Sequence, residues 1–267
     1  MQIGALDQVL TGEHEALRWD RHHTLAAALG LDGVELGVGV NYAQTQLWSA
    51  TGRRALLAQS QAQGVATASL CLHGYWQLSL ASDDEGIRAQ GVCLGQEACG
   101  IAAELGASHL LVPLTCPPGV ADALARERWV AGMRQCAPAA EESGVVLCLE
   151  NVGRAFANAH EDVAAIIDAV GSSAVQAYYD PGNAVHYGTD PLAGVTVLGQ
   201  RIAQVHVKEM GGTLLGEGQV PWPAILAALR AGGYDGWLVF ETEPTADPAA
   251  AAARNLATLS GWLAAIV

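Results

Sequence analysis

A short apolar run ends on a carboxylate in the segment VVLCLEN, residues 145–151, where the carboxylate belongs to Glu150. An unbroken apolar run of this length is typical of a strand that is buried on both faces. Three later segments repeat the pattern of an apolar run followed by a metal-ligand residue: AVQAYY before Asp180, IAQV before His206 and WLVF before Glu241. We call Glu150, Asp180, His206 and Glu241 the four-ligand cluster. A carboxylate at the end of a buried strand is costly to desolvate without a positive partner, so the pattern predicts that the cluster meets one.

Strand-like and helix-like segments alternate along the whole chain. Apolar segments predict strands at 2–6, 32–36, 65–72, 109–113, 145–149, 174–179, 202–205 and 237–240. Segments rich in Ala and Leu predict helices at about 13–29, 52–63, 83–105, 121–142, 161–170, 190–198, 221–231 and 247–263. Alternating strands and helices in this number predict an α/β fold, a (β/α)8 TIM barrel that forms a single domain over residues 1–267.

The alternative architecture is a doubly wound open sheet. No glycine-rich nucleotide-binding loop follows the first predicted strand, which weakens that alternative. The four-ligand cluster lies at the carboxyl ends of the fifth to eighth predicted strands, and barrel enzymes keep their active sites at this end of the barrel. The placement of the polar residues therefore favours the barrel.

Length and composition are those of a globular enzyme. A single barrel of about 250 residues fits the length. Hydrophobic residues make up 51% of the chain, but no apolar run approaches the roughly 20 residues of a membrane helix, and no signal peptide is recognisable. The six cysteines form no CxxC pair, and Cys71 and Cys148 fall inside predicted strands, which indicates reduced packing residues. We therefore expect a cytoplasmic protein with no membrane partner.

The net charge of −14 arises from 13 basic and 27 acidic residues, and the lysines and arginines form no cluster. Proteins that bind nucleic acid neutralise phosphates with such clusters, so we expect no nucleic-acid partner.

The four-ligand cluster has the composition of a site for a divalent cation. Carboxylate oxygens suit Mn²⁺ and Mg²⁺, and the imidazole also admits Co²⁺, Zn²⁺ or iron. Without a cation, three neighbouring carboxylates would repel one another and their pKa values would rise. A single acid or histidine at a strand end is more often a capping or loop-facing residue. Four such residues in the same register predict one bound metal ion.

Several motifs carry a resemblance to a known family. They are CLEN at 148–151, YDPGN at 179–183, HVKE at 206–209, LGEGQVPW at 215–222, and GYDG at 233–236 followed by Glu241. From residue 33 to residue 241 the chain resembles the sugar phosphate isomerase/epimerase family of xylose isomerase-like TIM barrels, whose members include D-tagatose 3-epimerase, L-ribulose-5-phosphate 3-epimerase and inosose isomerase or dehydratase. The resemblance implies that the four-ligand cluster binds one divalent metal, most often Mn²⁺. It also implies that Glu150 and Glu241 are the catalytic acid/base pair.

Three positions depart from the pattern of the D-tagatose 3-epimerase subgroup. Phe156 replaces a substrate-binding glutamate, Asn183 replaces a histidine and Gly212 replaces an arginine. These departures argue against a free-ketohexose 3-epimerase. The DPGN and HVK forms are more similar to branches that act on pentulose phosphates, inososes or other keto-sugars.

Five further residues are candidates for substrate binding. Lys208 follows His206 by two positions and so points to the same side of its strand. The others lie near cluster residues or at a strand end, and each has an ordinary structural alternative in capping, packing or a surface salt bridge. The candidates are His73, Trp76, Asn183, His186 and Lys208.

The residues and the resemblance together predict a role in carbohydrate metabolism, as a metal-dependent isomerase or epimerase of a ketose, ketose phosphate or keto-sugar. The reaction would pass through an enediolate, with two glutamates moving protons. Three alternatives stay open: a keto-sugar lyase or dehydratase on the same metal site, an apurinic-site endonuclease and a noncatalytic sugar-binding protein. The partner would be a sugar or sugar phosphate, and the resemblance also implies a homodimer or homotetramer.

Overall fold

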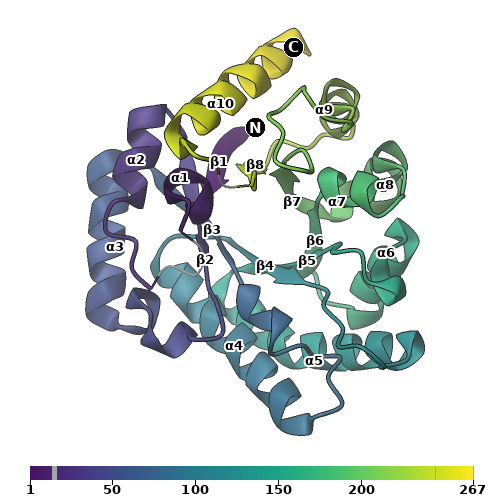
Figure 1. Ribbon diagram of the computed structural model, residues 1–267. Helices are drawn as coiled ribbons and strands as arrows, with labels where there is room; N and C mark the ends of the chain where they lie inside the picture. Colours follow the sequence, from purple (N-terminus) through teal and green to yellow (C-terminus); the bar gives the residue numbers. More distant parts are fainter. Residues whose placement is uncertain (14–16, 244, 267) are drawn as a thin grey trace.

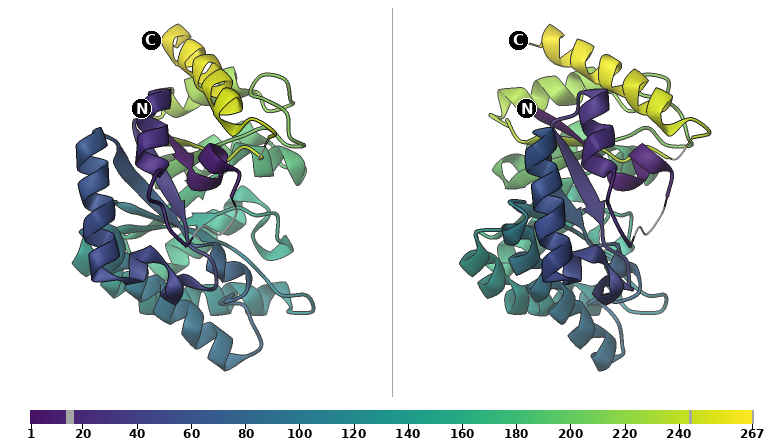
Figure 2. Two further views of the ribbon diagram at one scale, coloured as in Figure 1. Left: turned by 60° about the vertical axis from the view of Figure 1, so that its left-hand side comes forward. Right: turned by 90° about the vertical axis from the view of Figure 1, so that its left-hand side faces the viewer.

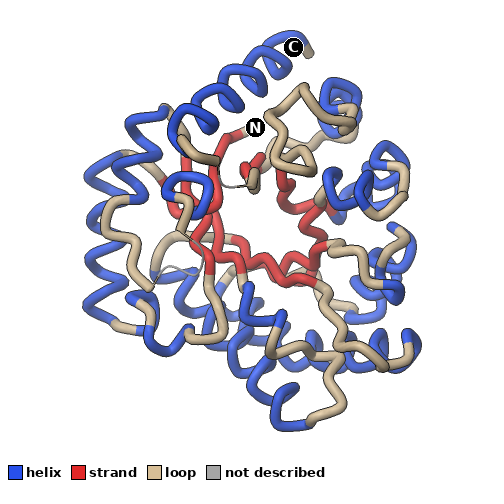
Figure 3. Tube along the Cα trace, in the orientation of Figure 1, coloured by secondary structure: helices blue, strands red, loops and turns tan. Residues whose placement is uncertain are grey.

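The strands close into a parallel barrel in the order β1 to β8, with β8 paired to β1. The computed structural model describes residues 1–13, 17–243 and 245–266. Figure 3 shows the strands as an inner ring surrounded by helices. The strands are β1 Gln2–Leu6, β2 Gly33–Gly37, β3 Ala66–Cys71, β4 His109–Pro113, β5 Val146–Glu150, β6 Val175–Tyr179, β7 Ile202–Val207 and β8 Trp237–Phe240. The closed order confirms the predicted TIM barrel and rules out the open sheet.

Helices cover the outside of the barrel (Figures 1 and 2). They are α1 Asp7–Thr11, α2 His22–Leu29, α3 Ala50–Gln63, α4 Glu85–Glu104, α5 Asp122–Ser143, α6 His160–Val170, α7 Pro181–His186, α8 Pro191–Leu198, α9 Trp222–Ala231 and α10 Pro248–Ala265. The short 3₁₀ segments are η1 Tyr42–Gln44, η2 Gln46–Trp48, η3 His73–Trp76, η4 Ala155–Ala157 and η5 Gly199–Arg201. Because α10 packs against both α1 and α9, the two ends of the chain close the helical layer.

One predicted helix is wrong in its first half. The expected helix at 13–29 begins only at His22, and residues 14–16 lie outside the described residues. The chain before it is held by Trp19, whose backbone N–H donates to Gln46 Oε1 at 3.0 Å and whose indole N–H donates to Asp7 at 2.5 Å. These distant contacts, which composition does not reveal, take the place of helical hydrogen bonds.

A short helix, α7, was not predicted, and it begins directly after a cluster residue. Asp180 is its N-cap, and Asp180 Oδ1 accepts a hydrogen bond from the backbone N–H of Asn183 at 2.8 Å. Pro181 occupies the first turn, where the missing N–H is not needed. The cap fixes the Asp180 carboxylate against the end of β6.

Strand register brings the cluster to one end of the barrel. Glu150 pairs with Tyr178 on β6, and His206 pairs with Val239 on β8, two residues before Glu241.

All six cysteines are free, and Cys71 and Cys148 are buried, as predicted. Among the described helices, none combines the length and the apolar character that a membrane crossing requires.

Candidate metal centre

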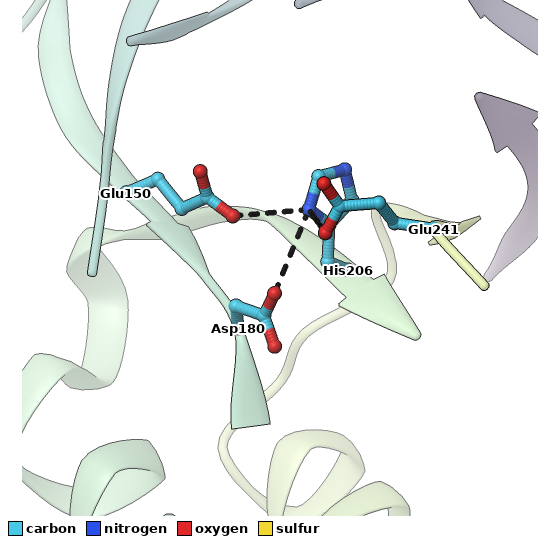
Figure 4. A group of neighbouring side chains, drawn as sticks. All are labelled: Glu150, Asp180, His206 and Glu241. Atoms are coloured by element: carbon cyan, nitrogen blue, oxygen red, sulfur yellow. Dashed lines mark hydrogen bonds and ion pairs between the residues drawn. The ribbon is translucent and has the colours of Figure 1, made fainter. Parts of the chain in front are cut away.

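The four-ligand cluster converges at the carboxyl ends of β5 to β8 (Figure 4). Each residue offers one ligand atom, and these atoms all lie within 4.8 Å of one another. Figure 4 shows the side chains of Glu150 and Glu241 extending toward the same nitrogen of His206, Glu150 from the left of the view and Glu241 from the right. Glu150, Asp180 and His206 are buried, whereas the Glu241 side chain is 18% exposed. The cluster is therefore mostly buried, and Glu241 is its most solvent-exposed member.

One nitrogen of His206 faces the carboxylates of the cluster. His206 Nδ1 lies 3.1 Å from Glu150 Oε1, 3.0 Å from Glu241 Oε2 and 3.8 Å from Asp180 Oδ2. Burial alone would lower the pKa of His206, but these carboxylates raise it well above its usual value. The Nδ1 position is thus a point of strongly negative potential.

The side chain of Asn151 links the ends of β5 and β6 by two hydrogen bonds. Its side-chain amide donates to the backbone carbonyl of Asp180 at 2.9 Å, and its Oδ1 accepts from the Asp180 N–H at 3.0 Å. Asn183 in turn donates to the Asn151 carbonyl at 2.9 Å and to Glu150 Oε1 at 3.5 Å. These contacts hold Glu150 and Asp180 in fixed relative positions.

Lys208 supplies the positive charge closest to the cluster. Its ammonium lies 2.7 Å from Asp180 Oδ2 and 2.6 Å from Glu241 Oε2. Burial alone would lower the pKa of Lys208, but Asp180 and Glu241 raise it well above its usual value. Lys208 is therefore a half-buried, charged donor that points into the site.

The two glutamates of the cluster have different electrostatic surroundings. Burial raises the pKa of Glu150 to about 7, although the hydrogen bond with His206 acts in the opposite direction. Burial would also raise the pKa of Glu241, but His206 and Lys208 together hold it well below its usual value.

The donor set fits a divalent ion. Asp180 Oδ2 is buried and accepts no hydrogen bond of good geometry, even though the Lys208 ammonium is close to it. Three carboxylates and one imidazole nitrogen within a few ångströms of each other form a cluster that could bind one metal ion.

A small cavity of about 120 Å³ opens above the cluster. We call it the site cavity. Four of the five predicted substrate-binding residues line it together with Glu150 and Glu241: His73, Trp76, Asn183 and Lys208. Pro113, Val152 and Tyr187 also line it and were not singled out from the sequence.

His186 does not line the site cavity. It lines a separate cavity of about 540 Å³, which it shares with residues of the 209–220 segment. The unpredicted helix α7 separates the two residues. Asn183 lies in its first turn and donates to Glu150, whereas His186 lies at the other end of the helix. The structure thus gives His186 no place beside the other candidates.

Tyr187 is held at the rim of the site cavity by close packing against Gly153. A Cβ at Gly153 would lie 2.2 Å from the Tyr187 ring, and the φ angle of this glycine is +69°. Gly153→Ala should destabilise the fold by about 1–2 kcal/mol through its left-handed backbone, and it should also raise KM by displacing the ring. Urea unfolding and steady-state kinetics measure the two effects.

Gly171 provides the matched control for this substitution. Its φ is +78°, and no atom lies within 4 Å of an added Cβ. Gly171→Ala should therefore show the backbone destabilisation with an unchanged KM. Equal KM values for the two variants would show that the Tyr187 ring does not affect the substrate.

A buried carboxylate on β2, Glu35, was also missed. Its Oε2 lies 2.9 Å from His206 Nε2, on the side of the imidazole opposite to the cluster. The signal was present in the sequence, because Glu35 is a lone charge between Val34 and Leu36 in a predicted strand. A charge in such a position requires a buried partner.

Comparison with known proteins agrees with the barrel fold and also identifies a family and related enzymes. The family model described as xylose isomerase-like TIM barrel matches residues 24–262. L-Ribulose-5-phosphate 3-epimerase from Salmonella paratyphi C is 27% identical over 246 residues, covering 88% of this chain and 87% of that protein. The enzyme of the same name from Shigella flexneri is 27% identical and covers 87% of this chain and 85% of its own length.

Solved structures show the same fold. D-Allulose 3-epimerase from Methylomonas sp. superposes with a TM-score of 0.83 at 23% identity, covering 98% of both chains. D-Psicose 3-epimerase from Clostridium cellulolyticum H10, solved with D-tagatose, gives a TM-score of 0.86 at 20% identity and covers 98% of this chain and 99% of its own. At these identities the likeness concerns the fold alone.

Proposed function

We propose that this chain, which belongs to the xylose isomerase-like TIM barrel family, is a metal-dependent epimerase of a ketose or ketose phosphate. The observation that carries the proposal is the convergence of the four-ligand cluster at the base of the site cavity. The relatives named L-ribulose-5-phosphate 3-epimerase, which align over most of the chain, favour epimerisation at carbon 3.

Glu150, Asp180, His206 and Glu241 would hold the ion. A divalent cation at this place supplies positive charge beside the carbonyl and hydroxyl oxygens of a ketose, and so makes the adjacent C–H bond more acidic. Mn²⁺ is our proposed ion, because three carboxylates and one imidazole suit it and the family resemblance favours it.

The two glutamates would move the protons. Their side chains extend toward His206 Nδ1 from the left and right of the view in Figure 4, and their carboxylate oxygens lie 3.1 and 3.0 Å from this nitrogen. With a ketose between them, one glutamate removes the proton from carbon 3, and the other returns a proton to the opposite face of the same carbon. The configuration of carbon 3 is thereby inverted, which defines an epimerase.

Lys208 would stabilise the negative charge that develops on the substrate oxygens. Its ammonium already lies within hydrogen-bonding distance of two cluster carboxylates. Lys208→Met should lower kcat/KM by about 10²–10³, as removal of one oxyanion donor does in other enzymes. The same change should leave metal affinity equal or higher, because it removes a cation beside the metal ligands. Kinetics and metal titration of one preparation test both parts, and an unchanged kcat/KM would contradict this role.

Arg154 is a candidate contact for a substrate phosphate. It is exposed, and its guanidinium lies 5.0 Å from the centre of the Trp76 ring at the rim of the site cavity. Arg154→Ala should raise KM for a ketose phosphate at least about tenfold, since a hydrogen bond to a charged group contributes about 1.5–3 kcal/mol. KM for the corresponding free ketose serves as the internal control and should not change. An equal rise for both sugars would argue against a phosphate contact.

Product analysis tests the proposed reaction. Protein supplied with Mn²⁺ is incubated with a panel of free and phosphorylated ketoses, and the products are identified by ¹³C NMR after the metal is removed. A 3-epimer supports the proposal. An aldose would assign isomerisation, and irreversible loss of water or cleavage would assign the alternative, a lyase or dehydratase that uses the same site.

Two broader expectations also remain proposals. We propose a cytoplasmic location, which the six free cysteines support. A homodimer or homotetramer rests on the family resemblance, and light scattering of the purified protein would measure the assembly.

A further inference from the structure

Four polar side chains form a closed hydrogen-bonded ring inside the barrel, directly beneath the four-ligand cluster. Ser69 Oγ and Tyr178 OH donate to Glu35 Oε1 at 2.6 and 3.1 Å. Gln204 Nε2 closes the ring by donating to Ser69 Oγ at 2.7 Å and to Tyr178 OH at 3.2 Å. We call these four residues, all 0% exposed, the buried ring: Glu35, Ser69, Tyr178 and Gln204.

The strands are locally irregular where they supply the buried ring. The β2–β3 pairing shifts register between Val34 and Glu35, and the β6–β7 pairing shifts between Ala177 and Tyr178. Such irregularities re-aim side chains and are found next to functional sites. Gln204 lies two residues before His206, so β7 directs both side chains into the barrel.

The buried ring satisfies only one oxygen of Glu35. Its other oxygen, Oε2, lies 2.9 Å from His206 Nε2, while Nδ1 of the same imidazole faces the cluster. A fully buried carboxylate is unfavourable unless it is paired and hydrogen-bonded. A histidine that binds a metal ion must be neutral. In a neutral imidazole one nitrogen donates and the other accepts, so an Nε2–H that donates to Glu35 leaves the Nδ1 lone pair directed at the cluster.

We propose that Glu35 is a positioning residue that fixes the tautomer and orientation of His206, so that His206 presents Nδ1 as a metal ligand. The buried ring holds Glu35 in turn. This inference rests on the proposed metal site and adds to it a residue from β2, outside the strands that carry the ligands. Carboxylates that orient a metal-bound histidine raise metal affinity by about 10- to 100-fold in other proteins.

Metal titration tests the proposal without the use of activity. The Kd of Co²⁺ is measured from its visible absorption for the wild type, Glu35→Gln and Glu35→Ala. Both variants should bind about 10- to 100-fold more weakly. Glu35→Gln preserves the size of the side chain, so it decides the question if Glu35→Ala does not fold. Tyr178→Phe, which removes one donor to Glu35 but retains the carboxylate, should weaken binding less than either.

Thr67→Val is the matched structural control. Thr67 is buried and lies on β3, the strand that carries Ser69 of the buried ring. Its hydroxyl lies 3.2 Å from His23 Nε2, so the variant loses a buried contact that does not involve His206. Its Co²⁺ affinity should stay within about twofold of the wild type, because effects at sites without shared partners are independent.

The imidazole tautomer gives a second, spectroscopic readout. In Zn²⁺-loaded protein labelled with ¹⁵N-histidine, NMR should show the His206 proton on Nε2 in the wild type and a changed nitrogen pattern in Glu35→Ala. Folded Glu35 variants that bind Co²⁺ as tightly as the wild type and retain its tautomer would overturn the inference and leave the proposed function intact. A wild-type protein that takes up no stoichiometric Co²⁺ would instead overturn the metal site itself, and the inference with it.

Discussion

Glu150→Gln is expected to lower kcat by about 10²–10⁴, the range that a positioned general acid or base contributes. Glutamine retains the shape of the side chain and one oxygen, but it can neither take nor give a proton at neutral pH. Because Glu150 is also a proposed metal ligand, its metal affinity should fall as well. The rate must therefore be measured at a metal concentration that saturates the variant, so that the chemical step is separated from metal loss.

Glu241→Gln should lower kcat by a similar factor. The kcat of the double variant should be only slightly lower than that of the less active single variant. The two glutamates act on one proton-transfer sequence, and residues that act as a unit are strongly non-additive. Glu104→Gln is the control, since this carboxylate lies on the surface in an ion pair with Arg53. Multiplicative losses in the double variant would mean that the glutamates work in separate steps.

Removal of the metal is the second change with a large expected effect. Chelation should abolish turnover, and readdition of Mn²⁺ should restore it. The loss of the ion should also lower the free energy of unfolding, by about 2.7 kcal/mol relative to protein with metal at 100 times Kd. Denaturant unfolding with and without the ion measures this difference.

His206→Gln separates metal stabilisation from general effects of chelation. The variant lacks the imidazole on which the cluster converges, so its free energy of unfolding should no longer depend on added metal. Metal-dependent stabilisation of the same size in His206→Gln would place the ion elsewhere in the protein.

The barrel and the four-ligand cluster could be predicted because both depend on local patterns. A buried parallel strand is a continuous apolar run. The residue that follows this run lies at the carboxyl end of the barrel, so its position can be predicted without knowledge of contacts with distant segments. Glu150 and Glu241 could therefore be located from their own neighbours. Lys208 followed from His206 by strand alternation alone.

The features that were missed depend on contacts between distant parts of the chain. Glu35 is 171 residues away from His206 in sequence, and no periodicity reports such a contact. The first half of the predicted 13–29 helix failed because Trp19 is anchored to Asp7 and Gln46. His186 was grouped with Asn183 on sequence proximity, and the short helix α7 separates them.

Exchange of carbon-bound hydrogen with solvent is the most direct test of the proposed epimerase reaction. The metal-loaded protein is incubated in D2O with L-ribulose 5-phosphate and a panel of related ketoses, and the recovered sugars are analysed by ¹H NMR after chelation. We expect deuterium to enter at carbon 3 of at least one ketose, with the 3-epimer formed alongside, and we expect Glu150→Gln to suppress both. Protein with a full complement of metal that exchanges no carbon-bound hydrogen on any member of the panel would contradict it.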